Sequence, residues 1–159
     1  MAKGAGGVRG GGGHATPAQK IAEAITSLKN GKRASAIPFA VGDVEDRMKR
    51  FAHDHNIELA SDKLSMSPKQ IQHALRDSKS EAGKAVTSAE LISFPTRLRS
   101  MALYHDSNKG NFVYTDGRAK YIIHPNYTVK KNGSHVNFIT ASRITSTQEF
   151  SMSNYTKIE

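Results

Sequence analysis

Three side chains that could act on a phosphate share one side of an expected helix. Lys69, His73 and Arg76 are spaced four and then three residues apart, so on a helix they form one ridge. An imidazole titrates near neutral pH, and two neighbouring cations disfavour its protonated form, so the free ring can accept a proton. A bound polyanion would restore its basicity. The alternative is an ordinary solvated basic face.

A second set of polar side chains lies in the last expected strand and its neighbour. Strand alternation puts Thr140 and Ser142 on one face and Arg143 on the other, unless a bulge intervenes. In the preceding strand, Lys120 shares a side with His124. These hydroxyls and cations are candidates for contacts to phosphoryl oxygens.

Residues 107–148 are basic in their own right, with six Lys or Arg against one Asp. Aromatic residues are interleaved with these cations, a pairing typical of proteins that bind single-stranded nucleic acid. Aromatic residues are also ordinary strand formers, so a purely structural role for any one ring is the alternative. The candidate nucleic-acid contacts along the chain are Lys69, Arg76, Arg118, Tyr121, Lys130 and Lys131.

The composition of the whole chain favours a polyanionic partner. Twenty-three Lys and Arg against 14 Asp and Glu leave a net charge of +9 over 159 residues, with a pI near 9.9. Nucleic acid is the first candidate, and anionic lipid or an acidic protein the second. No apolar run approaches the roughly 20 residues that a membrane span requires, so we expect no membrane partner.

Several kinds of chemistry are excluded or disfavoured by the residues present. The absence of cysteine excludes disulfides, thiolate metal sites and a cysteine nucleophile. His53 and His55 are two residues apart and would point away from each other on a helix, so we expect no metal site. Neither a phosphate-binding P-loop nor a dinucleotide fingerprint occurs. We therefore expect no cofactor.

Helix signals fill the first hundred residues. Thr16 and Pro17 predict a helix over 17–29, and Asp43 can cap a second helix that runs to about His55. Ser67 opens a third helix to about Lys79. A capping box of Thr87 and Glu90 opens a fourth, which Pro95 is expected to end or kink.

Strand signals fill the rest of the chain, where β-branched and aromatic runs alternate with turn dipeptides. The expected strands are near 102–106, 111–115, 118–124, 127–131 and 134–144. The fold class is therefore α+β, with N-terminal helices packed on an antiparallel meander sheet of four to five strands. The chain divides into a flexible, Gly-rich basic tail at 1–14, a helical region at 15–60 and a further domain at 61–159.

Short segments between about residues 60 and 150 resemble a known family. The segments are Ser67-Pro68-Lys69-Gln70-Ile71-Gln72-His73, Thr87-Ser88-Ala89-Glu90-Leu91-Ile92-Ser93-Phe94-Pro95, Tyr104-His105-Asp106, Phe112-Val113-Tyr114, Lys120-Tyr121-Ile122-Ile123 and Val136-Asn137-Phe138-Ile139-Thr140-Ala141-Ser142-Arg143. They resemble the phage-associated nuclease branch of the superfamily of barnase, EndoU, colicin and RelE-like proteins. The resemblance implies a metal-independent ribonuclease domain at 61–159, with a helical part packed on a four-stranded antiparallel sheet.

The resemblance also implies where the site would be. His73 matches the helical histidine of the family, and Thr140, Ser142 and Arg143 match the polar end of its last strand. A second histidine or polar position of the family falls on Asp77, Ser78 or Lys79, which leaves the general acid open.

RNA can be cut without a metal when its own 2′-hydroxyl attacks the adjacent phosphate. In this scheme His73 is the base or acid, Arg143 and Lys120 bind the phosphate, and Thr140 or Ser142 bonds a phosphoryl oxygen. His124 or His105 could be the second proton carrier, and the sequence does not choose between them.

The expected function is thus an endoribonuclease of the toxin or phage-effector type. The alternative is a noncatalytic nucleic-acid-binding or phage virion structural protein. RNA is the expected partner, and an acidic immunity or inhibitor protein is a second one that would use the same basic surface. The expected site of action is the bacterial cytoplasm, reached in a phage particle or through a secretion system.

Overall fold

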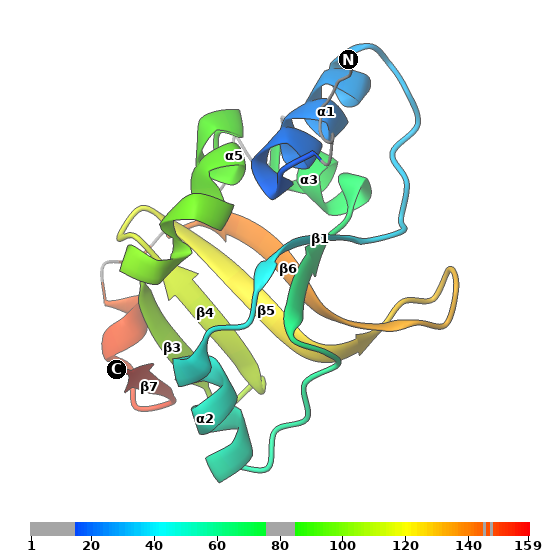
Figure 1. Ribbon diagram of the computed structural model, residues 1–159. Helices are drawn as coiled ribbons and strands as arrows, with labels where there is room; N and C mark the ends of the chain where they lie inside the picture. Colours follow the sequence, from blue (N-terminus) through cyan, green and yellow to red (C-terminus); the bar gives the residue numbers. More distant parts are fainter. Residues whose placement is uncertain (1–14, 76–84, 145, 147) are drawn as a thin grey trace, which may run out of the picture.

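One sheet organises the described part of the chain, with helices packed against it (Figure 1). The computed structural model describes residues 15–75, 85–144, 146 and 148–159. The predicted tail at 1–14 and the end of the third expected helix, which includes Arg76, lie outside these residues.

The helix starts predicted from capping residues are confirmed at two places. α1 spans Pro17–Lys29, and the Thr16 hydroxyl accepts from the backbone N–H of Gln19 at 3.1 Å. α5 spans Ser88–Arg97 behind the capping box of Thr87 and Glu90. Pro95 lies inside this helix and does not end it, and a short 3₁₀ turn η1 follows at Leu98–Ser100.

α2 is shorter than expected, whereas α3 begins where predicted and continues to the last residue described before the gap at 76–84. α2 spans Asp46–Asp54 and its N-cap is Glu45, so the prediction that Asp43 caps it was wrong. Asp43 instead ends a strand. α3 spans Pro68–Leu75, and Ser67 accepts from the N–H of Gln70 at its start.

The sheet is larger than predicted and is mixed. In the described residues it has seven strands in the order β1-β2-β6-β5-β4-β3-β7. Their bounds are β1 Phe39–Asp43, β2 Lys63–Met66, β3 Ala102–Asp106, β4 Asn111–Thr115, β5 Ala119–Thr128, β6 His135–Arg143 and β7 Tyr155–Ile158. The α+β class is confirmed, and β3 to β6 form an antiparallel meander. The expected sheet of four to five antiparallel strands is corrected, because β2 joins β6 in parallel and β1 and β7 extend the edges.

The two strands expected at 118–124 and 127–131 are a single strand, β5. Its pairing with β6 shifts register between His124 and Tyr127, which marks a β-bulge. Asn126 at the bulge has a positive φ of 52°, and its N–H donates to the Asn137 side chain at 3.2 Å. The Pro125-Asn126 pair therefore bends the strand without ending it.

The helices cover one face of the sheet, called here the helix-covered face. Phe94 of α5 stacks on Tyr121 with ring centroids 4.4 Å apart and meets Tyr114 edge-on. Phe51 of α2 meets Phe112 on the same side of β4. Figure 1 shows α1, α3 and α5 gathered toward one end of the sheet and α2 at the other.

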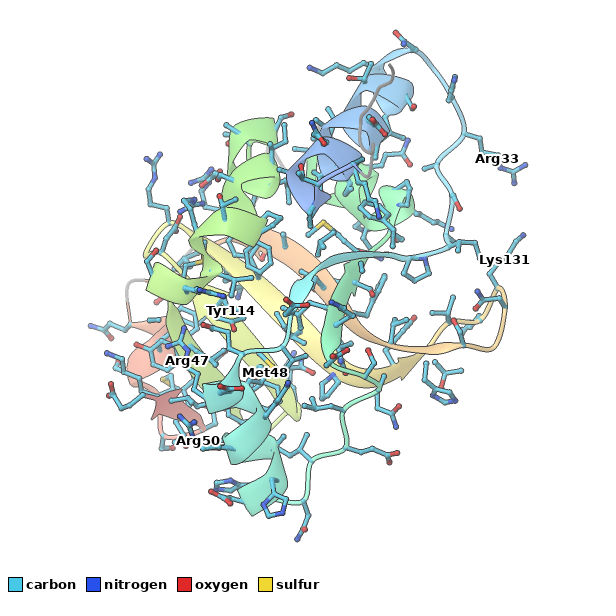
Figure 2. The ribbon with its side chains drawn as sticks, viewed as in Figure 1. Arg33, Arg47, Met48, Arg50, Tyr114 and Lys131 are labelled. Carbon is cyan, nitrogen blue, oxygen red and sulfur yellow. The ribbon has the colours of Figure 1, made fainter. Side chains whose placement is uncertain are left out.

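A polar network fixes the start of α2 to this face. The Tyr114 hydroxyl donates to Glu45 at 2.5 Å, and Arg47 donates to the Met101 carbonyl at 2.9 Å. Burial, and then the bond to Glu45, raise the pKa of Tyr114, so the phenol stays protonated. Figure 2 shows Arg47 and Tyr114 close together beside α2.

Candidate nucleic-acid interface

The face of the sheet away from the helices, called here the open face, carries alternate residues of β5 and β6. In the register of these strands, His124 lies opposite Phe138, Ile122 opposite Thr140, and Lys120 opposite Ser142. Strand alternation places these six side chains on one face. Three of the predicted site residues, Lys120, Thr140 and Ser142, are therefore brought together.

A histidine and a hydroxyl are in contact near the middle of this face. His124 Nε2 lies 3.1 Å from Thr140 Oγ1. Burial lowers the pKa of His124, so the imidazole is predominantly neutral at neutral pH. A neutral ring oriented by a hydroxyl can take up a proton from a bound substrate.

A hollow of about 230 Å³, which we call the cationic hollow, is lined by Tyr127, whose ring centroid lies 6.4 Å from that of His124; His124 and Thr140 themselves are not among its lining residues. Its cations come from two segments, Lys69 at the start of α3 and Lys130 and Lys131 in the β5–β6 hairpin. Tyr127 and Phe138 form an aromatic wall, with ring centroids 4.9 Å apart and planes 15° from parallel. Three predicted nucleic-acid contacts thus line one hollow together with two stacked rings.

A third segment lies beside the cationic hollow. The N–H of Lys69 donates to the Ser35 carbonyl at 2.9 Å, which places the chain between α1 and β1 against the start of α3. Ala36 of this segment lines the hollow. Figure 2 shows Arg33 and Lys131 extending on the same side of the molecule. Three stretches of chain therefore line the hollow, and two of them contribute lysines to it.

The C-terminal segment covers the opposite end of the open face. Lys120 Nζ lies 2.7 Å from Glu149 Oε2, and the Tyr155 hydroxyl donates to the same oxygen at 3.1 Å. Phe150, in the 3₁₀ turn η2 at Glu149–Ser151, stacks on Tyr104 of β3. Lys120 thus lies on the same face as Thr140 and Ser142, but its ammonium group is already paired with the Glu149 carboxylate.

Two predicted site residues lie on the helix-covered face and are corrected. Tyr121 is 0% exposed, and its hydroxyl donates to the Glu90 carbonyl, so it is a core residue and not a surface for bases. Arg143 projects away from Thr140. On the helix-covered face it donates to the Glu90 carboxylate at 2.6 Å and to the Ala85 carbonyl. The sequence does not predict the burial of Tyr121, because the ring that covers it, Phe94, belongs to a helix far away in the chain.

The remaining predicted residues lie outside the cationic hollow. Arg118 is exposed in the β4–β5 turn, at the other end of β5 from Tyr127. His73 is exposed on α3, one turn beyond Lys69, and is not among the residues that line the hollow. Arg76 lies outside the described residues. Thr140 and Arg143, which the expected scheme assigns to one phosphate, lie on opposite faces of β6, as strand alternation predicts.

The structure distinguishes the two histidines that the sequence left as alternatives. His105 lies among Phe51 and Phe112 on the helix-covered face, and its buried Nε2 has no hydrogen-bond partner in the described part of the chain. Burial, and then the nearby His55, lower its pKa. His124 alone of the two lies on the open face beside Thr140.

Sequence reasoning missed the role of Asn137. Asn137 is fully buried and bonds the backbone of residues 60, 61, 63 and 126. Its amide therefore fixes the bulge that sets the direction of Tyr127. The available signal was Pro125-Asn126 in the middle of a strand pattern, a combination typical of bulges.

Among residues 15–75 and 85–159, with 145 and 147 left out, no group of three or more His, Cys, Asp or Glu side chains could hold a metal ion. In the same ranges no helix is long and apolar enough to cross a membrane. Comparison of the chain with protein-family models, with curated proteins and with solved structures found no match.

Proposed function

We propose that the protein is a metal-independent endoribonuclease that binds RNA on the open face and uses His124 as its proton carrier. The contact between His124 Nε2 and Thr140 Oγ1 supports this most directly, because it orients a neutral imidazole whose ring centroid lies 6.4 Å from that of Tyr127, a residue that lines the cationic hollow. This role was expected for His73. We assign the role to His124 instead, because Thr140 orients its ring and Tyr127, beside it, lines the cationic hollow.

The reaction would be an internal transesterification. His124 takes the proton of the ribose 2′-hydroxyl, the 2′-oxygen forms a bond to phosphorus, and the bond from phosphorus to the 5′-oxygen breaks. The departing 5′-oxygen takes a proton from solvent. The products are a 2′,3′-cyclic phosphate and a free 5′-hydroxyl, so atoms and charges balance without a cofactor.

The surrounding residues have separate roles in this scheme. Thr140 fixes the orientation of the imidazole. Lys69, Lys130 and Lys131 bind phosphates next to the cleaved one, which holds the strand and offsets its charge. A phosphate close to His124 would raise its pKa and so strengthen it as a base.

The test is incubation of purified protein with RNA in excess chelator, followed by analysis of the new ends. Cyclic phosphate ends should appear, and His124→Ala should lower the rate by about 10²- to 10⁴-fold, the usual contribution of proton transfer. His53→Ala is the matched control, because His53 is an exposed histidine on α2. Full activity of His124→Ala would contradict the assignment.

A noncatalytic RNA-binding protein, as in a virion, is the second candidate, and one observation favours it. Both cations expected on the reacting phosphate are paired with carboxylates, Arg143 with Glu90 and Lys120 with Glu149. Under this alternative, RNA binds with a steep salt dependence but no new ends appear. An acidic inhibitor protein would compete for the same surface, and the bacterial cytoplasm would be the site of action.

A further inference from the structure

We propose that Tyr127 is a stacking platform for one unpaired base, so that the protein selects RNA that is single-stranded next to the cleaved phosphate. This inference rests on the RNA-binding part of the proposed function and does not need the cleavage step. It assigns a ligand to a ring that otherwise has no evident reason to face solvent.

The ring of Tyr127 has one covered and one accessible side. Phe138 stacks nearly parallel on it and is itself only 7% exposed. Tyr127 nevertheless keeps 40% of its surface exposed, one of three large hydrophobic residues so exposed among the described residues. Because one ring face is covered by Phe138, this exposure belongs to the other face and the edge. A base can stack there on a ring that is already held from behind.

The backbone directs Tyr127 to this position. In regular alternation Asn126 would face the same way as His124, and Tyr127 would point to the helix-covered face. The bulge inserts one residue, so Tyr127 lies opposite Val136 and on the same side as Phe138. Asn137, at 0% exposure, accepts from the N–H groups of both Ala60 and Asn126 and so fixes the bulge. The ring is therefore preorganised before a ligand binds.

Three lysines that can bind phosphate line the same hollow as the platform, namely Lys69, Lys130 and Lys131. The hollow of about 230 Å³ is smaller than the pockets of about 300–1,000 Å³ that enclose drug-sized ligands. It fits one base with its phosphate at the rim.

The position of Tyr127 relative to His124 indicates which nucleotide of the substrate must be unpaired. Phe138 backs Tyr127 and lies opposite His124 in the strand register. The rings of His124 and Tyr127 are 6.4 Å apart between centroids. A base stacked on Tyr127 therefore belongs to a nucleotide adjacent to the phosphate at His124. In a duplex that base is already paired and stacked, so a duplex cannot use the platform.

The experiment measures binding of a short 2′-O-methyl oligonucleotide, which cannot be cut by its own 2′-oxygen, as a single strand and as a duplex. Fluorescence anisotropy at fixed salt gives the dissociation constants of the wild type and of Tyr127→Ala, Tyr127→Leu and Tyr127→Phe. Loss of one stacked base should weaken single-strand binding by about 5- to 150-fold in the alanine and leucine variants. Tyr127→Phe should bind like the wild type, and duplex binding should be the same in all four proteins.

The leucine variant separates stacking from packing, because leucine still covers Phe138 but offers no aromatic face. Met152→Ala is the control, since Met152 is an exposed apolar residue outside the cationic hollow. Equal single-strand affinity in the wild type and Tyr127→Ala would overturn the proposal, as would full rescue by leucine or an equal loss for the duplex. An absence of cleavage products from ordinary RNA would refute the ribonuclease and leave this result standing.

Discussion

At the scale of single residues, two histidines with the same direction of pKa shift have different environments. Burial lowers the pKa of both His105 and His124. His105 Nε2 is enclosed without a hydrogen-bond partner in the described residues, whereas His124 contacts a hydroxyl on the open face. Their position in the sheet, and not their titration, therefore assigns them to a structural and a functional role.

His105 should make the folded state sensitive to acid. The pKa of His105 is lower in the folded than in the unfolded chain, so the neutral ring favours the folded state. Its contribution to the free energy of unfolding is complete above the unfolded pKa of about 6.5 and is lost as pH falls through the folded pKa. In His105→Phe the fall in the free energy of unfolding between pH 8 and pH 5 should be smaller. Urea unfolding at both pH values measures it.

The control for this prediction is His53→Ala, because His53 is exposed on α2. This variant should lose stability between the two pH values as the wild type does. An unchanged pH dependence in His105→Phe would show that protonation of His105 does not oppose folding.

Residue-level chemistry could be predicted from the sequence only in part. Strand alternation predicts that Lys120 shares a side with His124 and that Thr140 shares a side with Ser142, whereas the pairing of Lys120 with Ser142 comes from the register of the two strands. The buried state of Tyr121 does not follow, because its cover is Phe94 on a distant helix. Nor does the choice of His124 over His105, since it depends on which face of the sheet the helices cover.

At the scale of elements, Asn137 joins three strands through its side chain. The amide bonds backbone groups next to and within β2 and the bulge of β5, while Asn137 itself belongs to β6. Asn137→Ala would leave partly buried backbone groups of residues 60, 61, 63 and 126 without their side-chain partner, at up to about 1–3 kcal/mol each. We expect the free energy of unfolding to fall by at least about 3 kcal/mol.

Denaturant unfolding of Asn137→Ala measures this loss. His135→Ala in the same strand is the comparison, because His135 is exposed and its replacement should change the free energy of unfolding by no more than about 0.5 kcal/mol. Equal stability of the two variants would mean that the amide does not hold the strands together.

The C-terminal segment should compete with RNA for Lys120. Glu149 occupies the position that a phosphate oxygen would take, and Tyr155 holds it there. Glu149→Gln removes the negative charge and keeps the shape, so RNA affinity should rise by about 2- to 5-fold, in line with a partly exposed ion pair. Anisotropy with the 2′-O-methyl strand measures the change.

The matched control is Glu23→Gln, an equal change of charge at an exposed position of α1. An equal rise in both variants would reflect net charge alone and would contradict competition at Lys120.

Element boundaries followed from the sequence where the signal is local. The capping residues Thr16 and Thr87 placed two helix starts correctly. β1 and β2 were missed because each has only four or five residues and is stabilised by pairing with distant chain. The sequence predicts two strands where β5 is one, because the bulge between them is held by Asn137 of β6, a contact that no local pattern reveals.

At the scale of the whole molecule, three lysines from two distant segments line the cationic hollow. Lys69 and the Lys130-Lys131 pair are distant in sequence and meet only because β2 lies parallel to β6 and leads into α3. The net charge of +9 predicted a polyanionic partner, but the meeting point of the cations depends on the strand order, which no local pattern encodes.

Replacement of Lys69, Lys130 and Lys131 together by Gln should reduce the salt dependence of RNA binding. Each lost phosphate contact lowers the slope of log K against log salt by about 0.7 for a single strand, so the triple variant should lose about 2. Lys49→Gln with Arg50→Gln on α2 is the control, because Figure 2 shows Arg50 well away from Lys131. An equal loss of slope per removed charge in these two variants would mean that binding is spread evenly over the surface.

The central claim is that RNA binds the open face with a phosphate next to His124. The most direct measurement is the pKa of each histidine by NMR, with and without saturating 2′-O-methyl single strand. The pKa of His124 should lie below its ordinary value in the free protein and rise on binding, while that of His105 on the helix-covered face stays unchanged. A His124 pKa that does not respond, or a rise confined to His105 or His73, would contradict the account.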